Sequence, residues 1–428
     1  LQQLRRAVDL VEGSIGRQLM RSLVRGGDAL FLCAAVSVGA QQRPVTFVRD
    51  TSHNLSELLG VKRFAVPLVG RDGRMIVTSE WFFGDVIALD SAWHKTSWKL
   101  ELGGRDEIAN VQRWGWSGDS IWVVDRVFNQ VAMLGKDAKV KESVGFPSWV
   151  RPTWGDRRQY PWFSNATMLA MFADGSLLVE PSGVRRFFDT PGYNPDLRLF
   201  LRVDRDGRIL RTVAQLPPMD GRVQLRSGTE RKSYNVPNFP RTAFHISSDA
   251  ERIAIVQPIG SDSGAFRVTA LNGSGDTVFS KRYVVDANRV DRAVAGPYLK
   301  SLQALGRYSA DQVRDTIARL MPQFNSPVVS VVNGIDHSVW IWIRRPGFDA
   351  QKAEWFVLDS LGNHAFTTLL PRQIKVYASR LDRLWSTEND RVKMATTLVT
   401  YRRSDLTSSP RSRSGSSSGT SSRAPRPE

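Results

Sequence analysis

Short apolar runs separated by polar turns repeat along most of the chain. The runs are rich in β-branched and aromatic residues, as in Ile121-Trp122-Val123-Val124. Continuous apolar runs of this kind are typical of strands that are buried on both faces. Asp-Gly, Gly-Asp and Asn-Gly pairs lie between the runs, and because these residues tolerate a positive φ they favour tight hairpin turns.

Six units with this pattern follow one another, and each consists of a turn and a strand followed by a second strand and turn. The units are 72–80 with 85–100, 118–125 with 130–144, 174–180 with 199–213, 248–257 with 266–284, 336–343 with 354–370, and 381–388 with 391–403. Such units, repeating at roughly 40–50 residues, are typical of a propeller, in which each blade packs against two neighbours. The pattern therefore predicts an all-β fold, a six-bladed β-propeller over residues 41–403. Seven blades is the alternative if residues 284–327 contain a degenerate unit.

Residues 309–321 favour a helix instead of a seventh blade. Ser309 with Gln312 resembles a capping box, Val313, Ile317 and Leu320 share one helical face, and a proline follows. We therefore expect a short inserted helix that caps one face of the ring. To close the ring, either residues 44–49 or residues 62–68 would pair with the sixth unit, and the sequence does not choose between them.

The two ends of the chain differ from the body. Residues 20–40 match a secretory signal peptide, with Arg21 and Arg25 before a short apolar run and with Val38 and Ala40 at the cleavage positions. Residues 1–19 are then expected to lie upstream of the true start of translation. The apolar run is shorter than the roughly 20 residues of a spanning helix, so we expect a periplasmic or secreted protein without a membrane span in its mature chain. Residues 404–428 are rich in Ser and Arg and are expected to form a disordered tail.

The formal net charge is +17, and about +13 of it lies between residues 41 and 403. A basic body suits anionic partners, although scattered arginines also serve solubility alone. The single cysteine, Cys33, lies in the segment expected to be removed. The mature chain would therefore have no disulfide and no thiolate metal site.

The segment VVDRVFNQVAML, residues 123–134, is similar to the NHL-repeat pattern. Asp125, Asn129 and Val131 occupy the positions of that pattern, and Gln130 stands where the family usually has Arg. The resemblance implies that Asp125 and Asn129 stabilise a turn between strands, which is a structural role.

The body also resembles the NHL- and TolB-like exported bacterial six-bladed propellers that carry no assigned activity. The shared features are a GD-x-(I/L)-W-V-x-D blade at residues 118–125, a D-x-D-G-R turn at Asp204, and a late W-x-V-L-D-x-x-G blade beginning at Trp355. These features describe blade architecture, and fold-level analogy does not assign a function.

The sequence contains no catalytic motif above background. No HExxH, GxSxG or phosphate-binding glycine loop occurs, and the five histidines are not spaced as metal ligands; we expect each to lie singly on a blade surface. No catalytic residue and no cofactor is therefore assigned. A calcium or zinc ion in the central channel, held by carboxylates and amides from several blades, would have no local signature and stays open.

The most informative segment for binding is FPSWVRPTWGDRRQYPWF, residues 146–163, which combines aromatic rings with arginines in one connection between blades. Its candidate ligand-binding residues are Trp149, Arg151, Trp154, Arg157, Arg158, Tyr160 and Trp162. Aromatic rings beside arginine can stack on sugars and pair with anions. The alternative is that these tryptophans plug the channel or join the second and third blades.

Two functions follow from these observations. The first is a non-enzymatic binding or interaction module for a protein or an anionic glycan, monomeric and without a nucleic-acid partner. The alternative is a metal-dependent hydrolase or lactonase of the propeller kind with its site at the central channel. Three or more carboxylates or amides converging at the channel mouth would favour the enzyme, and an apolar channel would favour the module.

Overall fold

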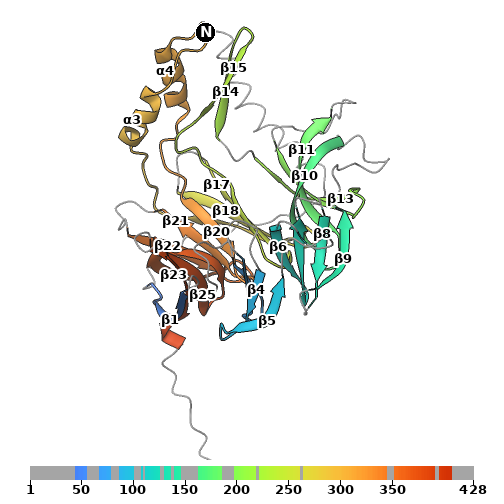
Figure 1. The fold of residues 1–428 in the computed structure, drawn as a ribbon. Coiled ribbons are helices and arrows are strands. Elements are labelled where there is room, and N and C mark those ends of the chain that lie inside the picture. The colour runs from blue at the N-terminus through green and yellow to red at the C-terminus, as the bar shows by residue number, and fades with distance from the viewer. Residues whose placement is uncertain are drawn as a thin grey trace, which may run out of the picture. The chain divides into compact units, whose positions relative to one another are not determined.

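The computed structural model describes one compact unit within residues 37–428. The residues it describes are 44–54, 67–78, 86–100, 108, 111–125, 130–135, 139–145, 162–185, 197–217, 221–260, 264–344, 351–390 and 395–406. Six four-stranded antiparallel sheets form the blades of the propeller (Figure 1). The six-bladed all-β fold predicted from the repeats is confirmed.

In five blades the four strands follow in chain order from the inner to the outer edge, and the sixth blade takes its outer strand from the N-terminal part of the chain. Blade 1 consists of β2 (Leu68–Val69), β3 (Met75–Thr78), β4 (Val86–Leu89) and β5 (Lys95–Leu100). Blade 2 consists of β6 (Val111–Ser117), β7 (Ser120–Asp125), β8 (Gln130–Leu134) and β9 (Val140–Gly145). Blade 3 consists of β10 (Trp162–Met171), β11 (Leu177–Arg185), β12 (Arg198–Val203) and β13 (Ile209–Leu216). Blade 4 consists of β16 (Ala243–Ile246), β17 (Arg252–Pro258), β18 (Ala265–Asn272) and β19 (Thr277–Val284). Blade 5 consists of β20 (Val328–Asn333), β21 (Val339–Ile343), β22 (Lys352–Leu358) and β23 (His364–Pro371). Blade 6 consists of β24 (Lys375–Ser379), β25 (Arg383–Asp390), β26 (Ala395–Arg403) and β1 (Phe47–Asn54).

The ring is closed by β1, which pairs antiparallel with β26 from Phe47 opposite Arg403 to Asn54 opposite Thr397. The backbone N–H of Ser404 also donates to the carbonyl of Thr46. The first of the two proposed closing segments is therefore the correct one, and Leu68 instead begins the inner strand of blade 1. A short 3-10 turn, Ser404–Leu406, carries the ordered chain slightly past the end that we expected.

Apolar clusters join each blade to the next around the ring. One cluster joins blades 1 and 2, one joins blades 2, 3 and 4, and three more join blades 4 and 5, blades 5 and 6, and blades 6 and 1. The middle strands are buried on both faces, as expected for a sheet between two others: Trp122 in β7 and Trp340 in β21 are almost fully buried. Burying each such side chain contributes about 1.5–3 kcal/mol, so these interfaces hold the ring together.

The expected core tryptophans lie in these clusters. Trp116, Trp122 and Trp340 are buried, and Trp114 and Trp342 pack partly buried against the same groups. Asp125 is fully buried at the end of β7, opposite Gln130, and its role in the turn stays a prediction. Its expected turn partner Asn129 lies outside the described residues.

The turns between third and outer strands share one design in four blades. An Asp or Asn side chain accepts hydrogen bonds from two backbone N–H groups further along the turn, at Asp90, Asp204, Asn272 and Asp359. The backbone N–H of His94 lowers the pKa of Asp90 in this way. In three of these turns a glycine follows in the left-handed region, for example Gly207 at φ +76°, where a side chain would be strained. In these four blades the side chain that opens the turn therefore fixes the connection between the third and outer strands by hydrogen bonds to the backbone.

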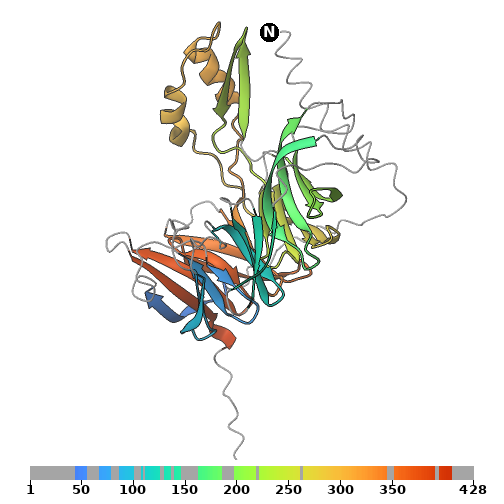
Figure 2. The same cartoon turned by 45° about the vertical axis from the view of Figure 1, so that its right-hand side comes forward.

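Two insertions flank blade 4 and form a small α/β layer that we call the cap, residues 221–241 and 286–325. The first insertion is the hairpin β14 (Arg222–Ser227) and β15 (Glu230–Asn235); the second contains the helices α3 (Arg292–Lys300) and α4 (Ala310–Leu320). Figures 1 and 2 both show the hairpin beside the two helices. An apolar cluster holds them together, built from Tyr234, Leu302, Leu305, Val313 and Ile317.

The cap corrects our expectation of a single inserted helix. The predicted helix is present as α4, with Ser309 and Gln312 in a complete capping box and with Val313 and Ile317 buried. Leu320, which we placed on the same buried face, is instead 44% exposed. It lies in the last turn of α4, beyond the apolar contact with the hairpin.

Of the helices described, none is both long and apolar enough to span a membrane. The expected signal peptide at 20–40, the upstream residues 1–19 and most of the expected tail at 404–428 lie outside the described residues.

Candidate binding site

One mouth of the central channel is bridged by the blade 4 turn, residues 247–251. The backbone N–H of Trp116 on blade 2 donates to the carbonyl of Ser248 at 2.7 Å, although blades 2 and 4 are not neighbours. The Ser248 hydroxyl also donates to the carbonyl of Val69 on blade 1, at 3.5 Å. These bonds tie three inner strands together at the end of the ring where inner strands turn back.

A network of ionic hydrogen bonds extends this bridge. Arg71 on blade 1 donates to Asp249 at 3.0 Å and also to Glu251, both on blade 4. Burial opposes the charge of Arg71, but the hydrogen bond to Glu251 and the charge of Asp249 outweigh it and raise the pKa of Arg71. His337 of blade 5 lies between Arg71 and Arg252, with each of its ring nitrogens 3.3 Å from a guanidinium nitrogen. The network therefore links blades 1, 4 and 5.

A hollow of about 260 Å³ lies at this mouth, and four carboxylates line it: Asp72, Asp119, Asp249 and Glu251. This number meets the criterion that we set for a channel enzyme. However, Asp72 is bonded to Arg74, and Asp249 and Glu251 are bonded to Arg71. In the described part of the chain, no group of three or more His, Cys, Asp or Glu is placed to hold a metal ion.

A second pocket, of about 830 Å³, lies between the cap and the edge of blade 4. We call it the cap pocket. Its lining is mainly apolar, from Phe239, Pro240, Pro258, Gly260, Val290, Leu320, Met321 and Pro322, and its polar lining residues are Arg289, Arg319 and Gln323. None of these eleven residues carries a carboxylate, imidazole, hydroxyl or thiol group.

Local structure places each part of this lining. Phe239 packs over Gly221, where a Cβ would lie 2.4 Å from the Cβ of Phe239. The two connections of the helical insertion pair with each other, because the N–H of Val290 donates to the carbonyl of Gln323 at 3.0 Å. These contacts fix the walls of the pocket, and Phe239 and Leu320 remain 40% and 44% exposed.

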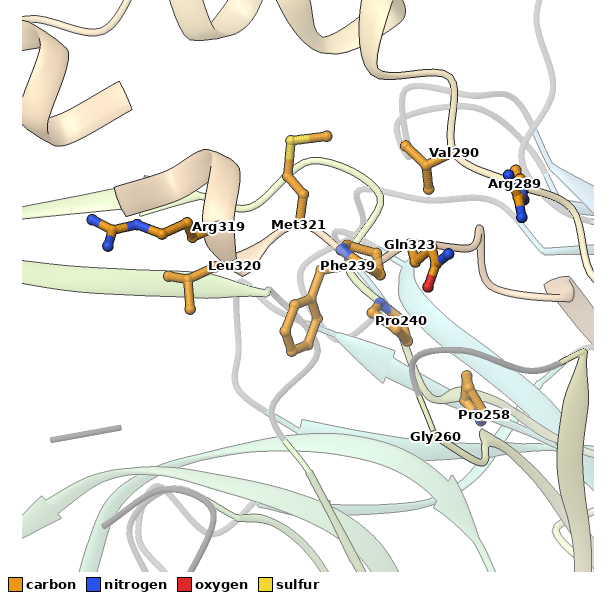
Figure 3. A pocket seen from close by; sticks show the side chains of 11 residues that line it. Phe239, Pro240, Pro258, Gly260, Arg289, Val290, Arg319, Leu320, Met321 and Gln323 are labelled. Atoms are coloured by element: carbon orange, nitrogen blue, oxygen red, sulfur yellow. The ribbon is translucent and has the colours of Figure 1, made fainter. Parts of the chain in front are cut away.

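The two arginines lie at opposite ends of the lining. Figure 3 shows Arg319 at one end, Arg289 at the other, and Phe239 with Met321 between them. Arg319 is steadied by a hydrogen bond from its Nε to the carbonyl of Asp315, and the Arg289 guanidinium lies over the Phe324 ring. Among the described residues, neither guanidinium has a carboxylate within salt-bridge distance.

Most of the binding residues proposed from the sequence are not among the residues that the structure describes. Trp149, Arg151, Trp154, Arg157, Arg158 and Tyr160 lie outside the described residues, and Trp162 is the first residue of β10. β9 ends and β10 begins at the same end of the ring as the cap insertions, because each connection joins an outer strand to the next inner strand. The cap pocket has no local signature in the sequence, because its lining residues come from four separate segments.

His245 corrects the expectation that each histidine lies singly on a blade surface. Its Nδ1 accepts a hydrogen bond from the backbone N–H of Asn333 at 3.1 Å, and the Asn333 side chain donates to the His245 carbonyl at 2.6 Å. Burial lowers the pKa of His245 to about 4. The neutral ring therefore serves as a hydrogen-bond acceptor between the inner strands of blades 4 and 5.

Comparison with known proteins gives no family for this chain. No family model matches it, and no curated protein matches it. Among solved structures it is similar to a member of the DUF4221 family from Bacteroides vulgatus, with 10% identity, 84% of this chain and 99% of the other covered, and a TM-score of 0.46. It is also similar to a streptogramin B lyase (10% identity, coverage 83% and 98%, TM-score 0.38) and to the calcium-binding protein regucalcin from Agrobacterium tumefaciens (10% identity, coverage 82% and 95%, TM-score 0.34).

Proposed function

We propose that this chain is an exported binding module and that its cap pocket holds an acidic, apolar segment of a protein partner. The observation that carries the proposal is the lining of the pocket, which combines exposed apolar side chains with an arginine at each end. Aromatic, Met and Arg side chains are enriched where proteins bind one another. The two guanidinium groups supply the preference for acidic residues.

A protein segment fits this lining better than a glycan does. Sugars expose many hydroxyl groups, and a buried polar group without a hydrogen bond costs about 1–3 kcal/mol. Only three of the eleven lining residues have polar side chains. We further propose that the aromatic–arginine segment 146–163 contributes to recognition, since β9 ends and β10 begins at the same end of the ring as the cap insertions.

The test is selection of peptides from a random display library on the intact chain, followed by calorimetry with the selected peptides. We expect apolar peptides with acidic residues, and a loss of affinity of at least tenfold for Phe239→Ala with Leu320→Ala, which is about 1.4 kcal/mol or more. Both side chains are substantially exposed, so the variant should fold. Leu361→Ala, which replaces another exposed leucine on blade 5, is the matched control.

Two results would contradict the proposal. One is that the selected peptides bind the double variant as tightly as the original chain. The other is that acidic oligosaccharides, rather than peptides, lose affinity when Phe239 and Leu320 are replaced.

A second function, a metal-dependent channel hydrolase, is favoured by the four carboxylates at the bridged mouth. Three of these carboxylates accept hydrogen bonds from arginines. We therefore expect that no metal ion bound at this mouth contributes to the stability of the fold. Treatment with a chelator should leave the melting temperature unchanged. Stoichiometric metal in the purified protein, with a lower melting temperature after its removal, would instead support the hydrolase.

A further inference from the structure

One face of blade 4 changes from apolar to basic along its strands. Ile255 and Leu271, on this face, are buried in the apolar cluster that joins blades 2, 3 and 4. Directly opposite residues share a face, and so do residues two positions apart in a strand. Thr269 is directly opposite Ile255, and Arg267 lies two positions from Thr269. Arg267 is in turn directly opposite Arg282 in β19, so both arginines lie on this face, and both side chains are exposed.

The two arginines have no acidic partner in the part of the chain that the structure describes. Elsewhere in the ring an arginine on an outer strand meets a carboxylate, as Arg211 does with Asp276 at 3.0 Å. Side chains directly opposite each other have Cβ atoms about 4.5–5.5 Å apart, and like charges in that position destabilise a sheet. The repulsion between Arg267 and Arg282 is therefore not offset by an ion pair with any described residue.

Hydroxyl groups and an apolar side chain flank the arginine pair on the same face. Thr269 and Ser280 form the next directly opposite pair, and their hydroxyl oxygens are 3.0 Å apart. Two hydroxyls carry two protons and the bond between them uses one, so the second proton can be donated to a ligand. On the other side of Arg282, Val284 is 48% exposed. We call Arg267, Arg282, Thr269, Ser280 and Val284 the blade 4 patch.

We propose that the blade 4 patch binds the phosphate monoester group of an organic ligand. Such a group carries a charge of about −1.5 to −2 at pH 7 and has three acceptor oxygens, which matches two arginines and a hydroxyl donor. Each guanidinium is a planar fork that can donate two hydrogen bonds to one phosphate. A carboxylate has one charge and two oxygens, so it would neutralise only one of the two arginines. Val284 offers an apolar contact for the organic part of the ligand. This inference concerns a surface and a ligand different from those of the cap pocket, and it does not depend on the proposed function.

The experiment is calorimetry of the intact chain with phenyl phosphate, phenyl sulfate and inorganic phosphate. We expect saturable binding of phenyl phosphate that weakens as salt rises. The other two should bind at least threefold more weakly, because phenyl sulfate has only one charge and inorganic phosphate has no apolar part. The affinity for phenyl phosphate should fall at least tenfold in Arg267→Gln with Arg282→Gln. The matched control, Arg208→Gln with Arg307→Gln, removes two exposed arginines from separate parts of the chain and should lose less than twofold.

A further probe distinguishes the source of the phosphate group. Vesicles that contain phosphatidic acid present the same monoester on a lipid surface. Retention of the chain on these vesicles, lost in the glutamine variant, would support the proposal with a lipid as the source. Binding of phenyl phosphate without retention on the vesicles would support it with a soluble ligand as the source.

Several outcomes would overturn the inference. They are equal losses in the two double variants, no binding of phenyl phosphate, or equal affinity for phenyl sulfate or for inorganic phosphate. If the glutamine variant does not fold, Arg267→Lys with Arg282→Lys keeps the charge but removes the fork, and unchanged binding by that variant would also overturn it. Phe239→Ala with Leu320→Ala should leave phenyl phosphate binding unaltered, which separates this result from the test of the cap pocket.

Discussion

Gly115→Ala is expected to lower the free energy of unfolding by about 3 kcal/mol, at the upper end of the cost of overpacking. A Cβ at Gly115 would lie 2.3 Å from the Trp122 ring and 2.6 Å from the backbone oxygen of Ser248. Trp122 is buried in the blade core, and the Ser248 oxygen is the acceptor of the bond that bridges blades 2 and 4. Neither neighbour can move without loss, so the substitution should strain the core and loosen the bridge together.

The measurement is urea unfolding of the variant beside Gly145→Ala. Gly145 lies at the end of β9, and a Cβ there would have no atom within 4 Å, so this control should change stability by less than about 1 kcal/mol. If the two variants unfold at the same urea concentration, the close approach at Gly115 does not restrict the ring.

Stability is expected to fall by about 3 kcal/mol between pH 6.5 and pH 4 because of His245. Burial holds its pKa in the folded chain at about 4, against 6.5 for an unperturbed histidine. Above pH 6.5 the ring is neutral in both states and the contribution is fully present. Between the two values the unfolded chain binds a proton that the folded chain does not, so unfolding becomes easier as pH falls. Each pKa unit corresponds to about 1.4 kcal/mol.

His245→Asn provides the test, since its amide oxygen can accept the hydrogen bond from Asn333 without titrating in this range. Unfolding free energies are measured for both proteins at pH 7.5 and pH 4.5. We expect the original chain to lose clearly more stability over this interval than the variant, even if the variant is less stable at pH 7.5. The same loss in both would show that carboxylates account for the pH dependence.

Local patterns in the sequence predicted most of the propeller. The apolar runs gave the strands, the Asp-Gly pairs gave the turns, and Ser309 with Gln312 gave the start of α4, because each depends on residues close together in the chain. The closing strand could also have been chosen in this way. β1 is largely polar, as suits an outer strand, whereas residues 62–68 are mainly apolar.

The other elements of the cap, the hairpin and α3, were missed because they lack those local signals. The hairpin turns at Gly228-Thr229 rather than at an Asn-Gly or Asp-Gly pair, and arginines interrupt its strands. Helix α3 contains Pro297 after Gly296, and both residues disfavour a helix interior. The cap pocket and the bond from Trp116 to Ser248 depend on residues far apart in the chain, which no local pattern reports.

Because β1 pairs with β26, β1 is synthesised long before its partner strand and stays unpaired until β26 has been made. The partners lie about 350 positions apart, as Thr51 and Thr400 show, and at roughly 5–20 residues per second β1 leaves the ribosome about 20–70 s before β26. An apolar strand left unpaired for so long would invite aggregation. Of the eight residues of β1, only Phe47 is buried in the finished ring and most of the others are polar. The strand that must wait longest for its partner is thus one that water can solvate in the meantime.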